Sequence, residues 1–135
     1  FFVTPLYAAL CGILLLMLSL RVVRYRQKFQ VSLGDGGHPE LQAAIRAQGN
    51  FAEYAPLALF LLFLLELTRE APVWALHLLG AALFLGRAIH AWGVLTSAPR
   101  SRPKPGRPIG IVMTFAMLLV TALWLLLVAL KRMTM

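Results

Sequence analysis

Residues 46–65 read RAQGNFAEYAPLALFLLFLL, a polar stretch that continues without a break into a run of Leu, Phe and Ala. The apolar run is typical of a helix that crosses a membrane. In the polar part, Arg46, Asn50 and Glu53 stand at positions i, i+4 and i+7, which share one face of a helix. A charged side chain at the centre of a bilayer costs about 2.5–3.5 kcal/mol. The stripe therefore predicts either a binding site for a polar ligand or a polar contact between membrane helices.

The composition indicates an integral membrane protein. The chain has 135 residues, of which 60% are hydrophobic and 13% are charged, whereas soluble domains average about 25% charged residues. This length predicts a single domain, residues 1–135. The net charge of +8 comes from basic residues that lie between apolar runs. That distribution favours anionic lipids and anionic small ligands over nucleic acid.

Apolar runs predict the fold class, an all-α membrane bundle of four transmembrane helices. The expected spans are at about residues 3–25, 41–68, 72–95 and 108–130. A Gly-rich stretch follows the first run and a Pro-rich stretch follows the third. Because the connections are short, neighbouring helices are expected to be antiparallel.

The distribution of Lys and Arg predicts the orientation. Most cations lie in or beside the first and third connections, and few lie on the opposite side of the membrane. The larger set is Arg21, Arg24, Arg26, Lys28, Arg46, Arg100, Arg102, Lys104 and Arg107, and the smaller set is Arg69, Lys131 and Arg132. Since cytoplasmic loops carry the excess of cations, both termini are expected outside and both basic connections in the cytoplasm.

A polar layer is expected in the cytoplasmic half of the membrane. With a rise of about 1.5 Å per residue, Glu53 lies about 10 Å from Arg46, while Arg87 and His90 lie about 12 and 8 Å from the end of the third helix. We expect Glu53 and Arg87 to form an ion pair, because neither charge is stable alone in a low dielectric. Polar groups on one side only favour a pocket open to the cytoplasm over a small multidrug transporter with access from both sides.

Structural roles remain open for the same residues. Arg46, Asn50 and Glu53 would also suit a polar contact between helices. Tyr54 would suit the aromatic belt at the membrane surface, and His90 a hydrogen-bonded core position. The sequence contains no evident metal-ligand cluster, Gly-rich phosphate loop or Ser-His-Asp arrangement.

Residues 46–57 closely resemble the second-helix signature of the membrane-associated proteins in eicosanoid and glutathione metabolism, the MAPEG family: Arg, Ala, Gln, any, Asn, any, any, Glu, Tyr or another residue, any, Pro. The order of the helices, the basic end of the first and the Arg-x-x-His of the third extend the resemblance over nearly the whole chain. It implies a homotrimer in a bacterial inner membrane or an internal membrane, with glutathione bound between protomers on the cytoplasmic side. It further implies transfer of glutathione to lipophilic electrophiles, or reduction of lipid hydroperoxides, without a metal.

The resemblance also implies roles for particular residues. Arg26 would lie near the glutathione thiol and Arg107 would activate it. Gln48 would reach the tripeptide from a neighbouring subunit. The expected glutathione-binding residues are Arg46, Gln48, Asn50, Glu53, Tyr54, Arg87, His90 and Arg100.

Two positions compete for the activating arginine. The leukotriene-synthase branch of the family places it at Ser101, between Arg100 and Arg102, whereas the microsomal transferase branch places it at the start of the fourth helix. The second placement favours Arg107, and His90 also resembles the microsomal branch. A cation near a thiol favours the thiolate, and arginine remains protonated. The alternative is a non-catalytic protein of the same fold that binds a lipid or a thiol.

Overall fold

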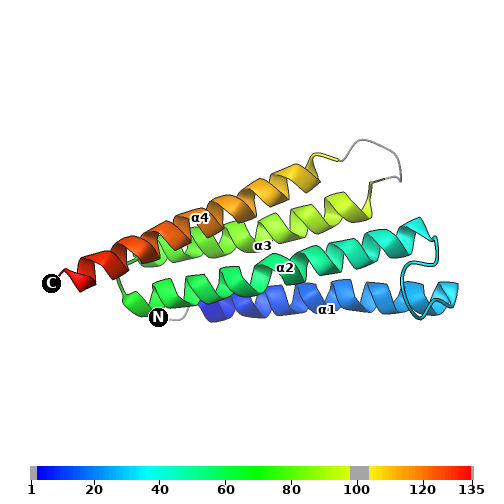
Figure 1. Cartoon of the computed structure of the whole chain (residues 1–135), viewed down its shortest axis with the longest axis horizontal. Coiled ribbons are helices and arrows are strands. Elements are labelled where there is room, and N and C mark those ends of the chain that lie inside the picture. Colours follow the sequence, from blue (N-terminus) through cyan, green and yellow to red (C-terminus); the bar gives the residue numbers. More distant parts are fainter. Residues whose placement is uncertain (1–2, 98–103, 135) are drawn as a thin grey trace.

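A computed structural model describes residues 3–97 and 104–134 of the chain. These residues form helices and contain no β-strand, which confirms the all-α prediction. The elements are α1 (Val3–Phe29), α2 (Pro39–Thr68), α3 (Val73–Leu95) and α4 (Gly106–Met133). All four are long and apolar enough to cross a membrane. Figure 1 shows an elongated bundle with both termini at one end and the α1–α2 connection at the other.

Local chemistry explains where the helices begin and end. α2 begins at Pro39, where the missing N–H of proline leaves no intrahelical hydrogen bond unmade. It ends at Thr68 and is capped by Arg69, a left-handed residue with φ 58°, whose N–H donates to the carbonyl oxygen of Glu66. α1 continues beyond the expected residue 25 to Phe29. The rings of Tyr25 and Phe29, four residues apart, stack there with centroids 5.9 Å apart.

α3 is the most buried helix of the bundle. Half of its most apolar stretch is buried, against 17% for α1, 28% for α2 and 22% for α4. α3 packs against α1, α2 and α4, and α2 also packs against α1 and α4. In the described residues α1 and α4 do not pack against each other. The outer faces of α1, α2 and α4 therefore present apolar side chains to the bilayer or to other protein chains.

α3 and α4 approach each other closely at glycines. A Cβ atom on Gly93 would lie 2.5 Å from the backbone nitrogen of Arg107, and one on Gly110 would overlap the carbonyl oxygen of Gly86. Small residues at such contacts allow membrane helices to approach. This contact holds the start of α4, which carries Arg107, beside the last turns of α3.

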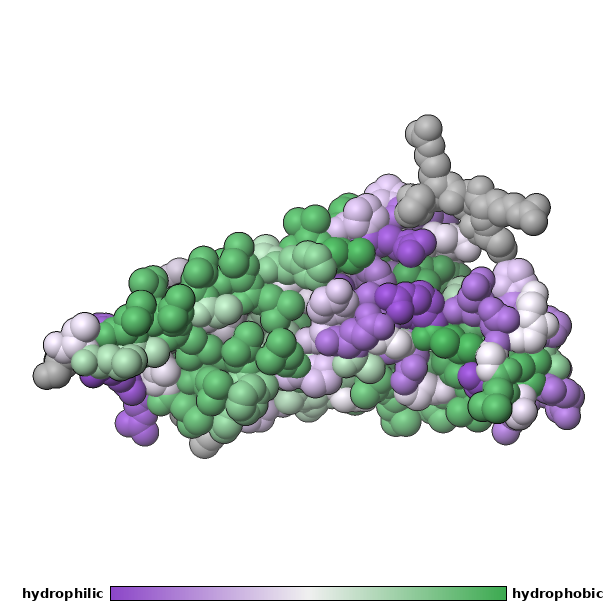
Figure 2. All heavy atoms as spheres, viewed as in Figure 1, coloured by the Kyte–Doolittle hydropathy of each residue, from purple (hydrophilic) through white to green (hydrophobic). Residues whose placement is uncertain are grey.

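The surface divides along the length of the bundle. Figure 2 shows mainly hydrophobic side chains over the half nearer the two termini and a gathering of hydrophilic side chains toward the opposite half. The α1–α2 connection lies at that opposite end. On this face, polar side chains are thus concentrated in the half of the bundle opposite the termini.

Candidate functional site

Arg87 lies at the centre of a buried polar layer that joins three helices. Its side chain on α3 is only 2% exposed. Nη1 donates to Oδ1 of Asn50 on α2 at 2.5 Å, and Nε donates to Oγ1 of Thr114 on α4 at 2.9 Å. Nη2 donates to the carbonyl oxygen of Gly110 at 3.3 Å. A charged hydrogen bond contributes about 1.5–3 kcal/mol, so this set strongly fixes the relative positions of α2, α3 and α4.

Tyr54 borders the same layer. The centroid of its ring lies 5.5 Å from the guanidinium carbon of Arg87 and 5.4 Å from the centroid of the Phe115 ring on α4. A guanidinium at this distance is attracted by the face of an aromatic ring. Arg87 therefore contacts two of the expected glutathione-binding residues, Asn50 and Tyr54.

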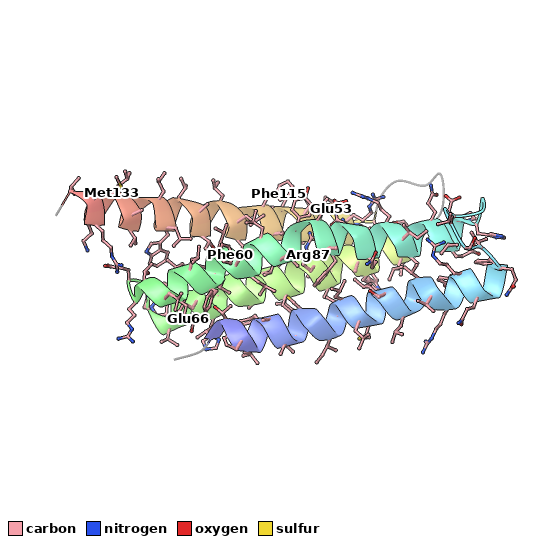
Figure 3. All side chains as sticks on the ribbon, turned by 60° about the horizontal axis from the view of Figure 1, so that its bottom comes forward. Glu53, Phe60, Glu66, Arg87, Phe115 and Met133 are labelled. Carbon is pink, nitrogen blue, oxygen red and sulfur yellow. The ribbon has the colours of Figure 1, made fainter. Side chains whose placement is uncertain are left out.

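Arg46 and Glu53 form an ion pair along the surface of α2. Nη1 of Arg46 lies 3.1 Å from Oε1 of Glu53, and Nη2 lies 3.4 Å from Oε2. The two side chains are 55% and 50% exposed. Asn50 stands between them on the same helix, so an exposed ion pair and a buried carboxamide occupy neighbouring positions. Figure 3 shows Glu53 on α2 at a level close to Arg87, with Phe60 and Glu66 further toward the termini.

The expected ion pair between Glu53 and Arg87 is wrong. Glu53 follows Asn50 by three residues and is therefore offset from it by about 60° around α2, at the exposed edge of the shared face, while Asn50 is buried against α3. Glu53 consequently meets Arg46, seven residues earlier on the exposed face. Asn50 is the residue of α2 that reaches Arg87.

His90 is buried in α3 near the start of α4, and α2, α3 and α4 each carry an arginine in this half of the bundle: Arg46, Arg87 and Arg107. His90 is 3% exposed, its Cβ packs against Gly110 of α4, and Gly93, three residues later on α3, packs against the backbone of Arg107. Glu53 is the acidic residue at this level of α2, since Asp35 and Glu40 lie in the α1–α2 connection and the first turn of α2, and Glu66 and Glu70 lie at the end that carries the termini. The layer therefore carries an excess of positive charge, which favours an anionic ligand.

Other predicted site residues lie apart from this layer or outside the described residues. Nη1 of Arg26 donates to the carbonyl oxygens of Val31, Ser32 and Gly34 at 3.5, 3.3 and 3.0 Å, which holds the α1–α2 connection. Gln48 is half-buried on α2. Arg100 lies outside the described residues, as do Ser101 and Arg102, the competing position for the activating arginine. The roles of these residues stay predictions.

Sequence reasoning missed Thr114. Its hydroxyl is buried on α4, accepts from Arg87 and donates to the carbonyl oxygen of Gly110 at 2.9 Å. The spacing of Gly110 and Thr114, two small residues four positions apart, is typical of a close helix contact and could have indicated this role.

Polar contacts at the opposite end were also missed. The carboxylate of Glu66 accepts hydrogen bonds from backbone N–H groups at the start of α1. The hydroxyl of Tyr7 donates to the carbonyl oxygen of His77 at 3.0 Å, which joins α1 to α3. In residues 3–97 and 104–134 no three His, Cys, Asp or Glu side chains are grouped to hold a metal ion.

The fold and the layer define an integral membrane protein of four helices with a cationic site inside the bundle. Residues 4–128 match the MAPEG family, and the chain belongs to this family. It is 44% identical over 91 residues to the inner membrane protein YecN of Escherichia coli strain K12, a match that covers 67% of this chain and 69% of YecN. YecN of Escherichia coli O6:H1 matches at the same identity over the same shares.

Proposed function

We propose that the protein is a glutathione-dependent transferase and peroxidase that acts as a homotrimer in a bacterial inner membrane. The observation that carries the proposal is the buried layer in which Arg87 contacts Asn50 and Tyr54, beside the half-exposed Arg46–Glu53 ion pair. Membership of the MAPEG family, which includes glutathione transferases, supports it. The concentration of cations in the α1–α2 and α3–α4 connections supports a site that faces the cytoplasm, with the termini outside.

The charges of the layer complement those of glutathione. At neutral pH the tripeptide carries two carboxylates and one ammonium group. The half-exposed ion pair of Arg46 and Glu53 offers a cation and an anion side by side, which suits the amino acid end of the ligand. Arginine holds carboxylates well because its planar group donates two parallel hydrogen bonds. Asn50 and Tyr54 adjoin this pair and complete the binding surface.

Arg107 is the proposed activator of the thiol. A free thiol has a pKa of about 8.5, so little thiolate is present at pH 7. A cation within about 4–6 Å favours the thiolate. Arg107 lies in the first turn of α4, where the positive end of the helix dipole acts in the same direction. The contact between Gly93 and the backbone of Arg107 fixes this turn against α3.

The reaction is attack by the thiolate on a lipophilic electrophile. In transfer, the sulfur forms a bond to an electrophilic carbon and the leaving group departs with the electron pair of the broken bond. In peroxide reduction, the sulfur attacks the peroxide, the O–O bond breaks and the lipid leaves as an alcohol. A second glutathione then forms the disulfide, so two thiols and one hydroperoxide give one alcohol, one water and one disulfide. Holding the two reactants together supplies much of the rate enhancement.

The protomer alone leaves part of the site exposed. Arg46 and Glu53 are each about half exposed on the side of α2. A homotrimer would cover this face with a neighbouring protomer, and Gln48 and Arg26 of that neighbour are the proposed additional contacts. The apolar outer faces of the helices are compatible with such packing and with surrounding membrane lipids.

The decisive experiment is the ultraviolet absorbance of the glutathione thiolate on mixing with purified protein. We expect a stoichiometric signal in the wild type, a loss of most of it in Arg107→Ala, and weaker ligand binding in Glu53→Gln. Arg24→Ala removes an exposed cation of α1 and serves as the matched control. A signal retained in Arg107→Ala would move the activating role to another arginine. Binding without thiolate would leave the non-catalytic alternative, and no binding would exclude glutathione as the ligand.

A further inference from the structure

We propose that Arg87 is a positioning residue for glutathione, and that it acts through Asn50. Its hydrogen bond to Oδ1 fixes the carboxamide so that the NH₂ group of Asn50 donates to an oxygen atom of the bound tripeptide. This inference rests on the proposed function, because it assigns an orientation to one of the proposed ligand-binding residues. It adds a requirement for a buried residue that does not itself touch the ligand.

The chemistry of the two groups determines the orientation of Asn50. A guanidinium has five N–H donors and no acceptor, whereas a carboxamide has one acceptor oxygen and one NH₂ donor. Nη1 of Arg87 lies 2.5 Å from Oδ1 of Asn50, so the carboxamide oxygen faces Arg87. The NH₂ group must then point away from Arg87, and it presents two donors on the other side of the carboxamide.

Arg87 is held too firmly to reach a ligand itself. It is 2% exposed and donates to Thr114 and Gly110 on α4 as well as to Asn50 on α2. Movement toward the surface would break these bonds and leave buried polar groups without partners, which is strongly unfavourable. Its influence on a ligand therefore passes through its neighbours.

The residue opposite Arg87 is a neutral amide, although a carboxylate would better balance a buried charge. The ion pairs in the described residues join Arg46 to Glu53 and Glu70 to Lys131 and Arg132, and none involves Arg87. An aspartate at position 50 would accept from Arg87 and neutralise it. It would present no donor to a ligand. A need for donors explains why an amide stands here, whereas stability alone does not.

Asn50→Asp separates the role of Asn50 as acceptor for Arg87 from its proposed role as donor to the ligand. The carboxylate keeps an acceptor for Arg87, so we expect a melting temperature equal to or above that of the wild type. It replaces the NH₂ donors with a negative oxygen, so we expect the Kd for glutathione to rise by at least about tenfold, the usual effect of losing a hydrogen bond to a charged group. The measurements are isothermal titration with glutathione and thermal unfolding, both on the full protein in nanodiscs.

A double-mutant cycle tests whether Arg87 acts through Asn50. We expect Arg87→Lys and Asn50→Ala each to raise the Kd for glutathione about tenfold, and the double variant to raise it no further, because coupled residues are not additive. Thr121→Val is the control, since Thr121 is also buried on α4 but donates within its own helix to the carbonyl oxygen of Met117. It should leave the Kd unchanged.

The outcomes separate this inference from the proposed function. Two results would overturn the role of Arg87 and leave the proposed function standing, provided that the wild type binds glutathione. One is an unchanged Kd in Asn50→Asp. The other is a Kd of the double variant that rises by the product of the two single effects. No binding by the wild type would overturn both. If Arg87→Lys does not fold, Thr114→Val replaces it in the cycle, because it removes the acceptor that holds Nε of Arg87, and an unchanged Kd in Asn50→Asp still overturns the inference.

Discussion

Oε2 of Glu66, near the end of α2, accepts a hydrogen bond from the backbone N–H of Thr4 at 2.9 Å. Oε1 accepts a second bond, from the N–H of Val3. The first N–H groups of a helix have no partner within the helix, and a negative charge there is also favoured by the helix dipole. A carboxylate of α2 therefore caps the start of α1, which is about sixty residues earlier in the sequence.

Removal of this cap should destabilise the protein without affecting the site. We expect Glu66→Ala to lower the free energy of unfolding by about 1–2 kcal/mol, the usual value for a lost helix cap. Glu66→Gln should have a smaller effect because one acceptor oxygen remains. Thermal unfolding in detergent, followed by circular dichroism, measures both. Glu70→Gln is the control at the same end of the bundle, and an equal effect there would contradict a specific capping role.

Glu53→Gln should change ligand binding far more than stability. The Arg46–Glu53 ion pair is about half exposed, and such pairs contribute about 0–1 kcal/mol. We therefore expect a melting temperature close to that of the wild type and a rise of about tenfold in the KM for glutathione, because the proposed partner of the ligand ammonium is lost. Steady-state kinetics with an aryl halide and thermal unfolding are the two measurements. A large loss of stability with an unchanged KM would show that the pair is structural.

Gly110→Ala should disrupt the contact between α3 and α4. The added Cβ would overlap the carbonyl oxygen of Gly86 and lie 2.5 Å from Cβ of His90. Overpacking of this kind costs about 1–3 kcal/mol, and it also displaces the first turns of α4, where Arg107 lies. We expect a lower melting temperature together with a reduced thiolate signal.

Gly12→Ala is the matched control for that substitution. The same methyl group on α1 would meet no other atom within 4 Å, and alanine favours a helix more than glycine does. Stability and activity should both be retained. An equal loss in the two variants would show that the α3–α4 contact is not the cause.

Thr114→Val should destabilise the buried layer more than Thr121→Val destabilises α4. Valine has nearly the shape of threonine but no hydroxyl, so Nε of Arg87 would lose its acceptor. A buried donor left unpaired costs about 1–3 kcal/mol. Thr121, among the residues that the structure describes, bonds within its own helix to the carbonyl oxygen of Met117. A difference in melting temperature between the two variants measures the bond to Arg87, and equal values would contradict its importance.

The sequence predicted the helices well because the signal for them is long and simple. An uninterrupted apolar run of membrane length has few alternatives to a spanning helix. The level of the polar layer was also predictable, since the rise of a helix converts sequence distance into depth. Asn50, Arg87 and His90 are accordingly all buried, and Asn50 meets Arg87, whereas Glu53 of the predicted layer is half exposed.

Side-chain pairing was not predictable in the same way. The expected Glu53–Arg87 pair rested on depth alone, whereas the actual partners depend on the rotation of α2 and on the approach of α4. Asn50 and Glu53 are offset by about 60° around α2, and this difference decides that Asn50 and not Glu53 is the neighbour of Arg87. Thr114 carries no charge and so gave no sign of its bond to Arg87. The capping bonds of Glu66 depend on where α1 begins beside α2, and no local sequence pattern predicts the relative position of two helix ends.

The hydrogen bonds of α1 to other helices have a consequence for amide exchange. In the described residues they come from Val3, Thr4 and Tyr7, all in the first two turns of the helix. The Arg87 layer, in contrast, joins α2, α3 and α4 and does not include α1. Local opening requires fewer broken contacts where such bonds are missing. Deuterium should therefore enter α1 progressively faster from its first turns toward Phe29, while the other three helices exchange slowly together.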